Sequence, residues 1–161
     1  MIYLLYMELN EEIYRIKSLL TENTNPYKIR VISEIETDRG YCVYYLTESN
    51  DVIGVVTLTD LNKVLENKEF NNDVKFLHEN YDKSKNTAYL HSIVVESPFR
   101  KQGFGTKLVK ECENIARNSG YKYITATVKK NNIPSQTMFN KLGYTKYNSN
   151  DKKDLFILSI D

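Results

Sequence analysis

The sequence contains few of the residues that build metal sites or disulfide frameworks. Among its 161 residues are two cysteines, Cys42 and Cys112, and two histidines, His78 and His91, and none has a close Cys or His partner in metal-ligand spacing. Cys42 falls in an expected strand, and Cys112 lies on the apolar side of an expected helix. We therefore expect no metal site, and we expect both cysteines to be reduced core residues of a cytoplasmic protein.

An excess of one charge and long apolar runs are also lacking. Lys and Arg number 22 and Asp and Glu number 21, so the formal net charge is +1, and no long basic patch argues for nucleic acid. The apolar opening of residues 1–7 lacks a basic leader and is too short to span a membrane. We expect neither a nucleic-acid partner nor a membrane partner.

The length is typical of one compact domain, so we expect a single domain over residues 1–161. There are no internal repeats. Runs rich in β-branched and aromatic residues predict strands, and apolar residues at helical spacing predict helices. The expected strands are 2–7, 41–47, 52–59, 87–96, 121–128, 144–148 and 155–160, and two of the expected helices are 10–20 and 133–142. Residues 27–35 fit either a strand or a short helix.

One stretch has the features of a phosphate-binding turn. Residues 93–106 join a strand-forming run to an Arg-x-x-Gly-x-Gly turn that opens into a helix. Gly103 and Gly105 let the backbone bend so that successive N–H groups can point at one anion, and the first helical turn adds unpaired donors. Arg100 and Lys101 add positive charge. The spacing fits neither the dinucleotide-binding Gly-x-Gly-x-x-Gly pattern nor the Gly-Lys-Ser/Thr loop of nucleoside-triphosphate sites.

The segment after this turn has the pattern of a helix buried against a sheet. Its apolar residues recur at steps of one, three and four, which places them on one side of a helix. They are Leu108, Val109, Cys112, Ile115 and Ala116. We expect Gly120 to end this helix as its C-terminal cap.

In this turn the sequence resembles the GCN5-related N-acetyltransferases, which bind acetyl-coenzyme A through an Arg/Gln-x-x-Gly-x-Gly/Ala turn between a strand and a helix. Downstream, the chain also has the family's late pattern of Asn, a small residue three positions on, an apolar–aromatic pair and Gly–aromatic. These residues are Asn132, Ser135, Met138, Phe139, Gly143 and Tyr144. The two motifs cover about residues 88–147. The resemblance implies an α+β fold with a mixed, mostly antiparallel central sheet of about six to seven strands, flanked by helices.

The resemblance also implies a function. It predicts an N-acetyltransferase that moves an acetyl group from acetyl-coenzyme A to a primary amine of an unidentified small molecule, protein or peptide, by direct transfer in a ternary complex. A distortion in the strand at 90–95 would free backbone groups for the pantetheine arm. The residues implied to bind the coenzyme are Ile93, Val94, Val95, Arg100, Lys101, Gln102, Gly103, Phe104, Gly105, Thr106, Asn132, Ser135 and Phe139.

The acid and the base are less clearly marked. His91 and Tyr89 share one face of their strand, and the histone-modifying branch of the family has a glutamate at the position of Tyr89. We take His91 as the candidate base, with Tyr89 beside it. Many family members have a Tyr at the position of Phe139, whose hydroxyl reaches the coenzyme sulfur. Phe139 cannot donate a proton, so water or another hydroxyl, such as that of Tyr144, would have to serve.

Two other functions stay open. Without the usual Tyr, the chain could be a non-catalytic module that binds or senses acyl-coenzyme A, and a plain α+β interaction domain is a third reading. The protein is expected to be a monomer or a homodimer, and the last strand, 155–160, would offer an edge for pairing. The polar segment 60–86 would lie on the acceptor side of the sheet.

Overall fold

The computed structural model describes residues 33–36, 42–48, 51–66, 86–95, 97–148 and 150–160. The expected strand 2–7, the expected helix 10–20 and most of the 60–86 segment lie outside these residues. The chain forms two compact units, Met1–Thr57 with Ser92–Val109, and Leu58–His91 with Lys110–Asp161. Each unit is described separately below.

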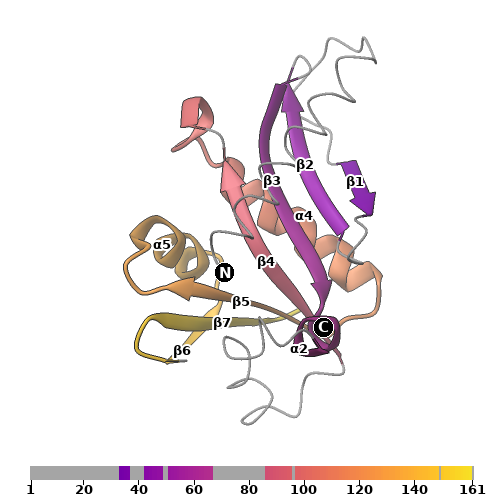
Figure 1. The fold of residues 1–161 in the computed structure, drawn as a ribbon, viewed down its shortest axis with the longest axis vertical. Helices are drawn as coiled ribbons and strands as arrows, with labels where there is room; N and C mark the ends of the chain where they lie inside the picture. Colours follow the sequence, from indigo (N-terminus) through magenta and orange to yellow (C-terminus); the bar gives the residue numbers. More distant parts are fainter. Residues whose placement is uncertain are drawn as a thin grey trace. The chain divides into compact units, whose positions relative to one another are not determined.

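The described strands of the first unit follow the order β1-β2-β3-β4 (Figure 1). They are β1 (Ser33–Glu36), β2 (Cys42–Glu48), β3 (Asp51–Asp60) and β4 (Thr87–Val95), of which β3 and β4 continue into the second unit. β1 pairs antiparallel with β2, from Ser33↔Tyr45 to Glu36↔Cys42. The strands expected at 41–47, 52–59 and 87–96 are therefore confirmed, and the ambiguous segment 27–35 forms a strand in its described part.

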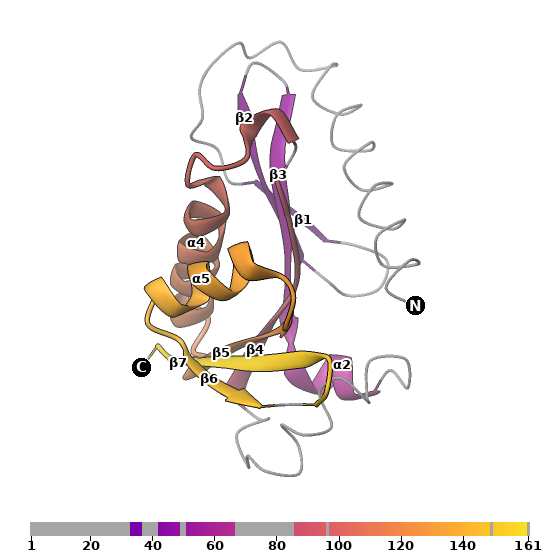
Figure 2. The ribbon, with the colours of Figure 1, turned by 90° about the vertical axis from the view of Figure 1, so that its left-hand side faces the viewer.

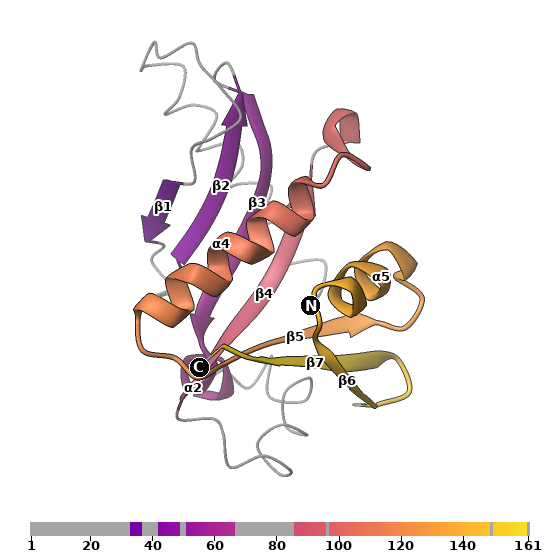
Figure 3. The same cartoon turned by 180° about the vertical axis from the view of Figure 1, so that it is seen from behind.

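A short turn leads from β4 to a long helix. The chain passes through the 3₁₀ turn η2 (Ser97–Phe99) and enters α4 (Phe104–Asn118), as Figure 3 shows. Leu108, Val109, Cys112 and Ala116 are fully buried, as their spacing predicts, whereas Ile115 is only partly buried. Gly120 follows with φ at +88°, and its N–H donates to the carbonyl of Arg117, so the predicted glycine cap is confirmed.

In the second unit the strand order is β3-β4-β5-β7-β6. The additional elements are α2 (Leu61–Glu66), β5 (Tyr123–Lys129), α5 (Ile133–Lys141), β6 (Thr145–Asn148) and β7 (Lys153–Ser159). β4 runs parallel to β5, from Thr87↔Tyr123 to Leu90↔Ala126, whereas β5–β7 and β6–β7 are antiparallel. The prediction of a mixed, mostly antiparallel sheet with helices is confirmed.

The expectation that the last strand is a sheet edge is wrong. β7 pairs with β5 over its whole length, and its other side pairs with β6 from Thr145↔Ile157 to Asn148↔Asp154. The chain reaches β6 first and then turns back, so β7 lies between β5 and β6. The backbone of β7 is therefore already paired on both sides and is not available to a second copy.

Aromatic rings bind α5 to the sheet of the second unit. The Phe139 ring on α5 stacks on the Phe156 ring of β7, with ring centroids 5.4 Å apart. Its centroid is also 5.0 Å from that of the Tyr144 ring, which it meets edge to face. Phe156 pairs with Ala126, so both side chains lie on the face that α5 covers. Figure 2 shows α5 beside β5 and β7. Residues one position away, including Thr125 and Thr127, lie on the opposite face.

Candidate functional site

The turn between η2 and α4 has the backbone geometry of an anion-binding loop. The Arg100 N–H donates to the Ser97 carbonyl at 3.3 Å, which closes the first turn. Lys101 then adopts φ of 63° and Gly103 φ of 84°. An added Cβ at Gly103 would meet no atom within 4 Å, so glycine is needed there for its backbone conformation and not for lack of space.

The amides of this turn are available to a ligand. The first helical bond of α4 runs from the Lys107 N–H to the Gly103 carbonyl at 3.1 Å. Within the described ranges, no acceptor is recorded for the backbone N–H groups of residues 102–106, and residues 101–103 are exposed. Unpaired N–H groups at a helix start carry a partial positive charge that favours phosphate oxygens. The residues present therefore fit a diphosphate.

Two side chains predicted to bind the coenzyme also hold the turn together. Arg100 donates from Nε to the Val95 carbonyl at 2.9 Å, and Gln102 donates from Nε2 to the Pro98 carbonyl at 3.3 Å. The rings of Phe99 and Phe104 meet edge to face, with centroids 6.3 Å apart. These contacts fix the backbone that presents the amides. Direct contacts of Arg100 and Gln102 with a coenzyme stay predictions.

The second motif begins a helix. Asn132 is the N-cap of α5, and its Oδ1 accepts a hydrogen bond from the Ser135 N–H at 3.3 Å. Pro134 lies in the first turn, where its missing N–H costs nothing. The Asn-x-x-Ser spacing therefore has a structural cause, a helix cap. A contact of Asn132 and Ser135 with the coenzyme stays a prediction.

Two aromatic candidates lie inside the core of the second unit. Phe139 is 2% exposed. Tyr144 is 5% exposed and donates its hydroxyl to Glu113 Oε1 at 3.0 Å. Burial, followed by the charge and hydrogen bond of Glu113, raises the pKa of Tyr144. Burial also raises the pKa of Glu113 above its usual value. This contact gives Tyr144 a packing role and offers no support for a role as proton donor.

The candidate base region lies on β4. Tyr89 is 4% exposed, and its hydroxyl lies 2.8 Å from Thr127 Oγ1 on β5. The backbone of His91 continues β4, but its side chain lies outside the described residues, so its role as base stays a prediction. Ile93, Val94 and Val95 form the partly exposed end of the strand.

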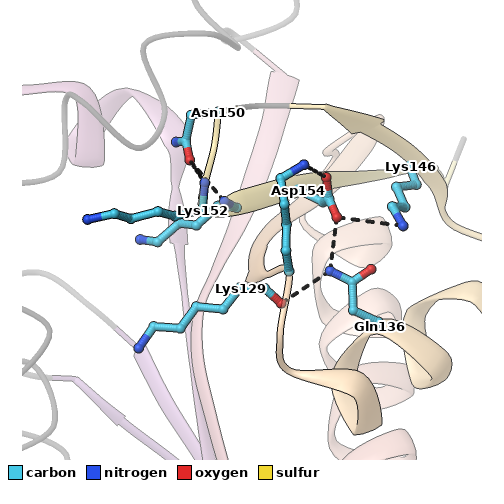
Figure 4. Close-up of polar contacts among 8 residues, drawn as sticks. Lys129, Gln136, Lys146, Asn150, Lys152 and Asp154 are labelled. Atoms are coloured by element: carbon cyan, nitrogen blue, oxygen red, sulfur yellow. Dashed lines mark hydrogen bonds and ion pairs between the residues drawn. The ribbon is translucent and has the colours of Figure 1, made fainter.

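Sequence reasoning missed a buried polar cluster around Asp154 (Figure 4). Gln136 of α5 donates from Nε2 to the Lys129 carbonyl at 3.2 Å and to Asp154 Oδ2 at 3.1 Å. Lys130 Nζ lies 2.9 Å from Asp154 Oδ1, and Lys146 Nζ lies 3.6 Å from Oδ2. The cluster joins the start of α5 to the ends of β5 and β7.

The charge of Asp154 is well compensated. Burial alone would raise the pKa of this carboxyl, but hydrogen bonds from Lys130 and Gln136 and the charges of Lys130 and Lys146 outweigh it, so the pKa is lowered. Gln136 Oε1 is buried and has no partner among the described residues. The signal that could have revealed the cluster is a lone acidic residue at the start of an apolar strand, next to several lysines.

The described ranges contain no group of three or more His, Cys, Asp or Glu side chains that could bind a metal ion. In the same ranges, none of the helices has the length and apolar character needed to cross a bilayer. Cys112 is buried and forms no disulfide, and burial, followed by the charges of Glu113 and Glu111, raises the pKa of its thiol.

The chain is similar to known acetyltransferases in sequence. The family model described as the acetyltransferase (GNAT) family matches residues 4–144. Over 71 residues the chain is 37% identical to the L-2,4-diaminobutyric acid acetyltransferase of Virgibacillus pantothenticus. This match spans 44% of the chain and 42% of that relative, so the chain aligns with less than half of the relative's length.

Several solved structures of similar fold are named as acetyltransferases. A protein assigned to the GNAT family from Desulfovibrio desulfuricans matches with a TM-score of 0.56 and 17% identity, over 75% of this chain and 69% of that one. A protein assigned as a streptothricin acetyltransferase from Bacillus anthracis, solved with acetyl coenzyme A, matches with a TM-score of 0.55 and 18% identity, over 74% and 62%. Identities this low show a shared fold only.

Proposed function

Because the chain belongs to the acetyltransferase (GNAT) family, we propose that it transfers an acetyl group from acetyl-coenzyme A to a primary amine of an acceptor, directly and within a ternary complex. The observation that carries this proposal is the set of unpaired amides at residues 102–106, in a turn shaped by Lys101 and Gly103. Acetyl-coenzyme A supplies an activated acetyl group as a thioester. The chain supplies binding, orientation and proton transfer.

The coenzyme side of the site uses main-chain donors. We infer that the amides of residues 102–106 bind the diphosphate, and that Arg100 and Lys101 add charge close to it. The partly exposed end of β4, residues 93–95, would hold the pantetheine arm and polarise the thioester carbonyl. Asn132, Ser135 and Phe139 complete the proposed set.

Proton transfer must do without the usual tyrosine. Phe139 has no hydroxyl, and the Tyr144 hydroxyl is directed at Glu113. We infer that water protonates the departing thiolate, which is tolerable because a thiol has a pKa of about 8.5. His91 remains the proposed base. If it is, a His91→Gln variant will lose the acidic limb of the pH–rate profile; overlaying profiles would remove His91 from the mechanism.

The acceptor is proposed only as an amine. The relative from Virgibacillus pantothenticus is named for a small diamino acid, so such amines belong in the first panel, with peptides and aminoglycosides beside them. The 60–86 segment is proposed to lie at the acceptor side. Deleting residues 67–83 and finding unchanged acceptor KM would exclude that role.

A second function stays under consideration because Phe139 has no hydroxyl and the Tyr144 hydroxyl already donates its hydrogen bond to Glu113. The chain would then bind or sense acyl-coenzyme A without turnover. Acceptor-stimulated release of coenzyme A separates the two functions. Slow hydrolysis that no amine accelerates would favour the sensor.

The binding test uses two matched glycines. Gly103 and Gly120 both have positive φ, at +84° and +88°, and an added Cβ is unobstructed at each. Calorimetric titration with acetyl-coenzyme A should show about tenfold weaker binding for Gly103→Ala, a loss of about 1.4 kcal/mol, and no change for Gly120→Ala. No heat with the folded wild-type chain would refute the proposed function.

Three further properties are proposals. We infer one domain, because β3, β4 and α4 each run through both compact units. We infer a cytoplasmic location from the sparse cysteines and the use of acetyl-coenzyme A. A monomer or a homodimer fits equally, and any pairing of chains has to use a surface other than β7.

A further inference from the structure

The start of α5 carries two polar side chains that a ligand can reach. Asn132 is exposed and Ser135 is half-buried. Asn132 Oδ1 accepts the Ser135 N–H and so caps the helix. Within the described ranges, no partner is recorded for Asn132 Nδ2 or for the Ser135 hydroxyl. Both groups are proposed to contact the coenzyme, and where they lie depends on where α5 begins.

One carbonyl at the end of β5 fixes the first turn of α5. The Lys129 carbonyl accepts the Asn132 N–H at 3.0 Å and Gln136 Nε2 at 3.2 Å. Gln136 also donates its main-chain N–H to the Asn132 carbonyl at 3.0 Å. The side chain of Gln136 thus joins the strand to the helix one turn beyond the cap. A change in its contacts changes the position and direction of the first turn.

Asp154 holds Gln136 from the neighbouring strand. It pairs with Val128 in the β5–β7 ladder, so the sheet sets the position of its backbone. Its Oδ2 accepts from Gln136 Nε2 at 3.1 Å, and its carboxylate is bound by Lys130 at 2.9 Å and by Lys146 at 3.6 Å. Figure 4 shows the contacts of the Asp154 carboxylate with Gln136 and Lys146. Gln136 is therefore fixed by contacts with both β5 and β7.

The hydrogen bonds of Gln136 contribute direction more than stability. Its Oε1 is buried and has no partner among the described residues, and an unpartnered buried acceptor costs free energy. Both of its acceptors have other donors, because the Lys129 carbonyl also accepts from Asn132 and two lysines bind Asp154. A methionine, which is similar in length and apolar, would avoid the cost of Oε1 and leave neither acceptor unpaired. What it would lose is the fixed geometry of the first turn.

We propose that Gln136 and Asp154 are positioning residues for coenzyme binding, because they hold the first turn of α5 where Asn132 and Ser135 meet the coenzyme. This inference rests on the proposed function and deepens it. Hydrogen bonds suit such a role, since they fix an angle as well as a distance, whereas apolar packing is non-directional. On the ligand side, the amide and phosphate oxygens of acetyl-coenzyme A accept hydrogen bonds from an amide N–H or a hydroxyl. Neither Gln136 nor Asp154 has to touch the coenzyme.

The first test removes the hydrogen bonds of Gln136. In Gln136→Met the Kd for acetyl-coenzyme A, measured by calorimetric titration, should rise about tenfold, which is the net worth of one or two hydrogen bonds. Its melting temperature should change by less than about 4 °C. Asp154→Ala removes the acceptor instead and, titrated well below its melting temperature, should raise the Kd by a similar factor. Asp154→Asn keeps an acceptor for Gln136, so its Kd should stay within about twofold of the wild-type value even though it is less stable.

Thr125→Val is the matched control for lost stability. The Thr125 hydroxyl is buried and donates to the Phe156 carbonyl at 2.8 Å. Thr125 lies on the face of β5 opposite α5, so this hydrogen bond does not act on Asn132 or Ser135. The variant should melt about 2–4 °C below the wild type and bind acetyl-coenzyme A with an unchanged Kd.

Three results would overturn the proposal. The first is a wild-type Kd in Gln136→Met. The second is a Kd that rises equally in Gln136→Met and Thr125→Val, because affinity would then follow general stability. The third is an Asp154→Asn variant that binds as weakly as Asp154→Ala, because the charge and not the hydrogen bond to Gln136 would then set the affinity. A wild-type chain that folds and binds no acetyl-coenzyme A would instead refute the proposed function itself.

Discussion

Asp154→Ala should destabilise the protein by about 2 kcal/mol. The carboxylate is 4% exposed and accepts from Lys130 at 2.9 Å and from Gln136 at 3.1 Å. Breaking a buried ion pair costs about 3–5 kcal/mol. The lysine side chains here are 39% and 47% exposed, so water screens part of the charge, and the lower figure is appropriate.

Most of this loss of stability comes from the hydrogen bond that Gln136 loses. Without Asp154 its Nε2 keeps only the Lys129 carbonyl, and its Oε1 already has no partner among the described residues. A loss of about 2 kcal/mol corresponds to a fall in melting temperature of about 4–8 °C for a chain of this size. Asp154→Asn keeps an acceptor for Gln136 but loses the charge, so it should cost about half as much.

Urea denaturation followed by circular dichroism measures both variants. Asp151→Ala is the matched control, because Asp151 is an exposed aspartate of the same turn and should change stability by less than about 0.5 kcal/mol. If Asp154→Ala were as stable as the control, the cluster would not hold α5 to the strands, and the reasoning from its contacts would fail.

Three further predictions concern stability. Because the pKa of Asp154 is lowered in the folded protein, its contribution to the free energy of unfolding is fully present above the ordinary pKa of about 3.9 and is lost as the pH falls through the lower folded value. The difference in stability between wild type and Asp154→Asn, measured in urea, should therefore shrink between pH 5 and pH 3. A constant difference would contradict this. Gly54→Ala would place its Cβ 2.8 Å from the Val94 carbonyl oxygen, so thermal melting should show a loss of stability of at least about 2 kcal/mol. A neutral effect would mean that β3 and β4 can move apart at this point without cost. Gly103→Ala and Gly120→Ala should each lower the free energy of unfolding by about 1 kcal/mol, because the alanine must adopt a positive φ. Clearly unequal losses would argue against a purely conformational cost.

The backbone of the turn proposed to bind the cofactor could be predicted from the sequence, because local residues determine its conformation. Gly103 and Gly105 mark a backbone shape, and the apolar spacing after them marks a helix, so local signals suffice. The same holds for Asn132 and Ser135, whose spacing is that of a helix cap. In these places the local conformation, on which the proposed function depends, follows from neighbouring residues.

Contacts between distant segments could not be predicted. Tyr144 and Glu113 are 31 positions apart, and nothing in the sequence indicates that the hydroxyl is bound to that carboxylate. The position of β7 between β5 and β6 depends on which strand of the antiparallel β6–β7 pair lies next to β5. The Asp154 cluster likewise brings together residues from three strands and a helix. Such features depend on register and packing, which a single sequence does not specify.

The central claim is that the amides of residues 102–106 bind the diphosphate of acetyl-coenzyme A, and amide chemical shifts report on those groups individually. Titrating acetyl-coenzyme A into ¹⁵N-labelled protein should move the signals of Gly103, Phe104, Gly105 and Thr106 most, and those of Gly120 and its neighbours little. Saturable binding that left the four signals in place would contradict the account.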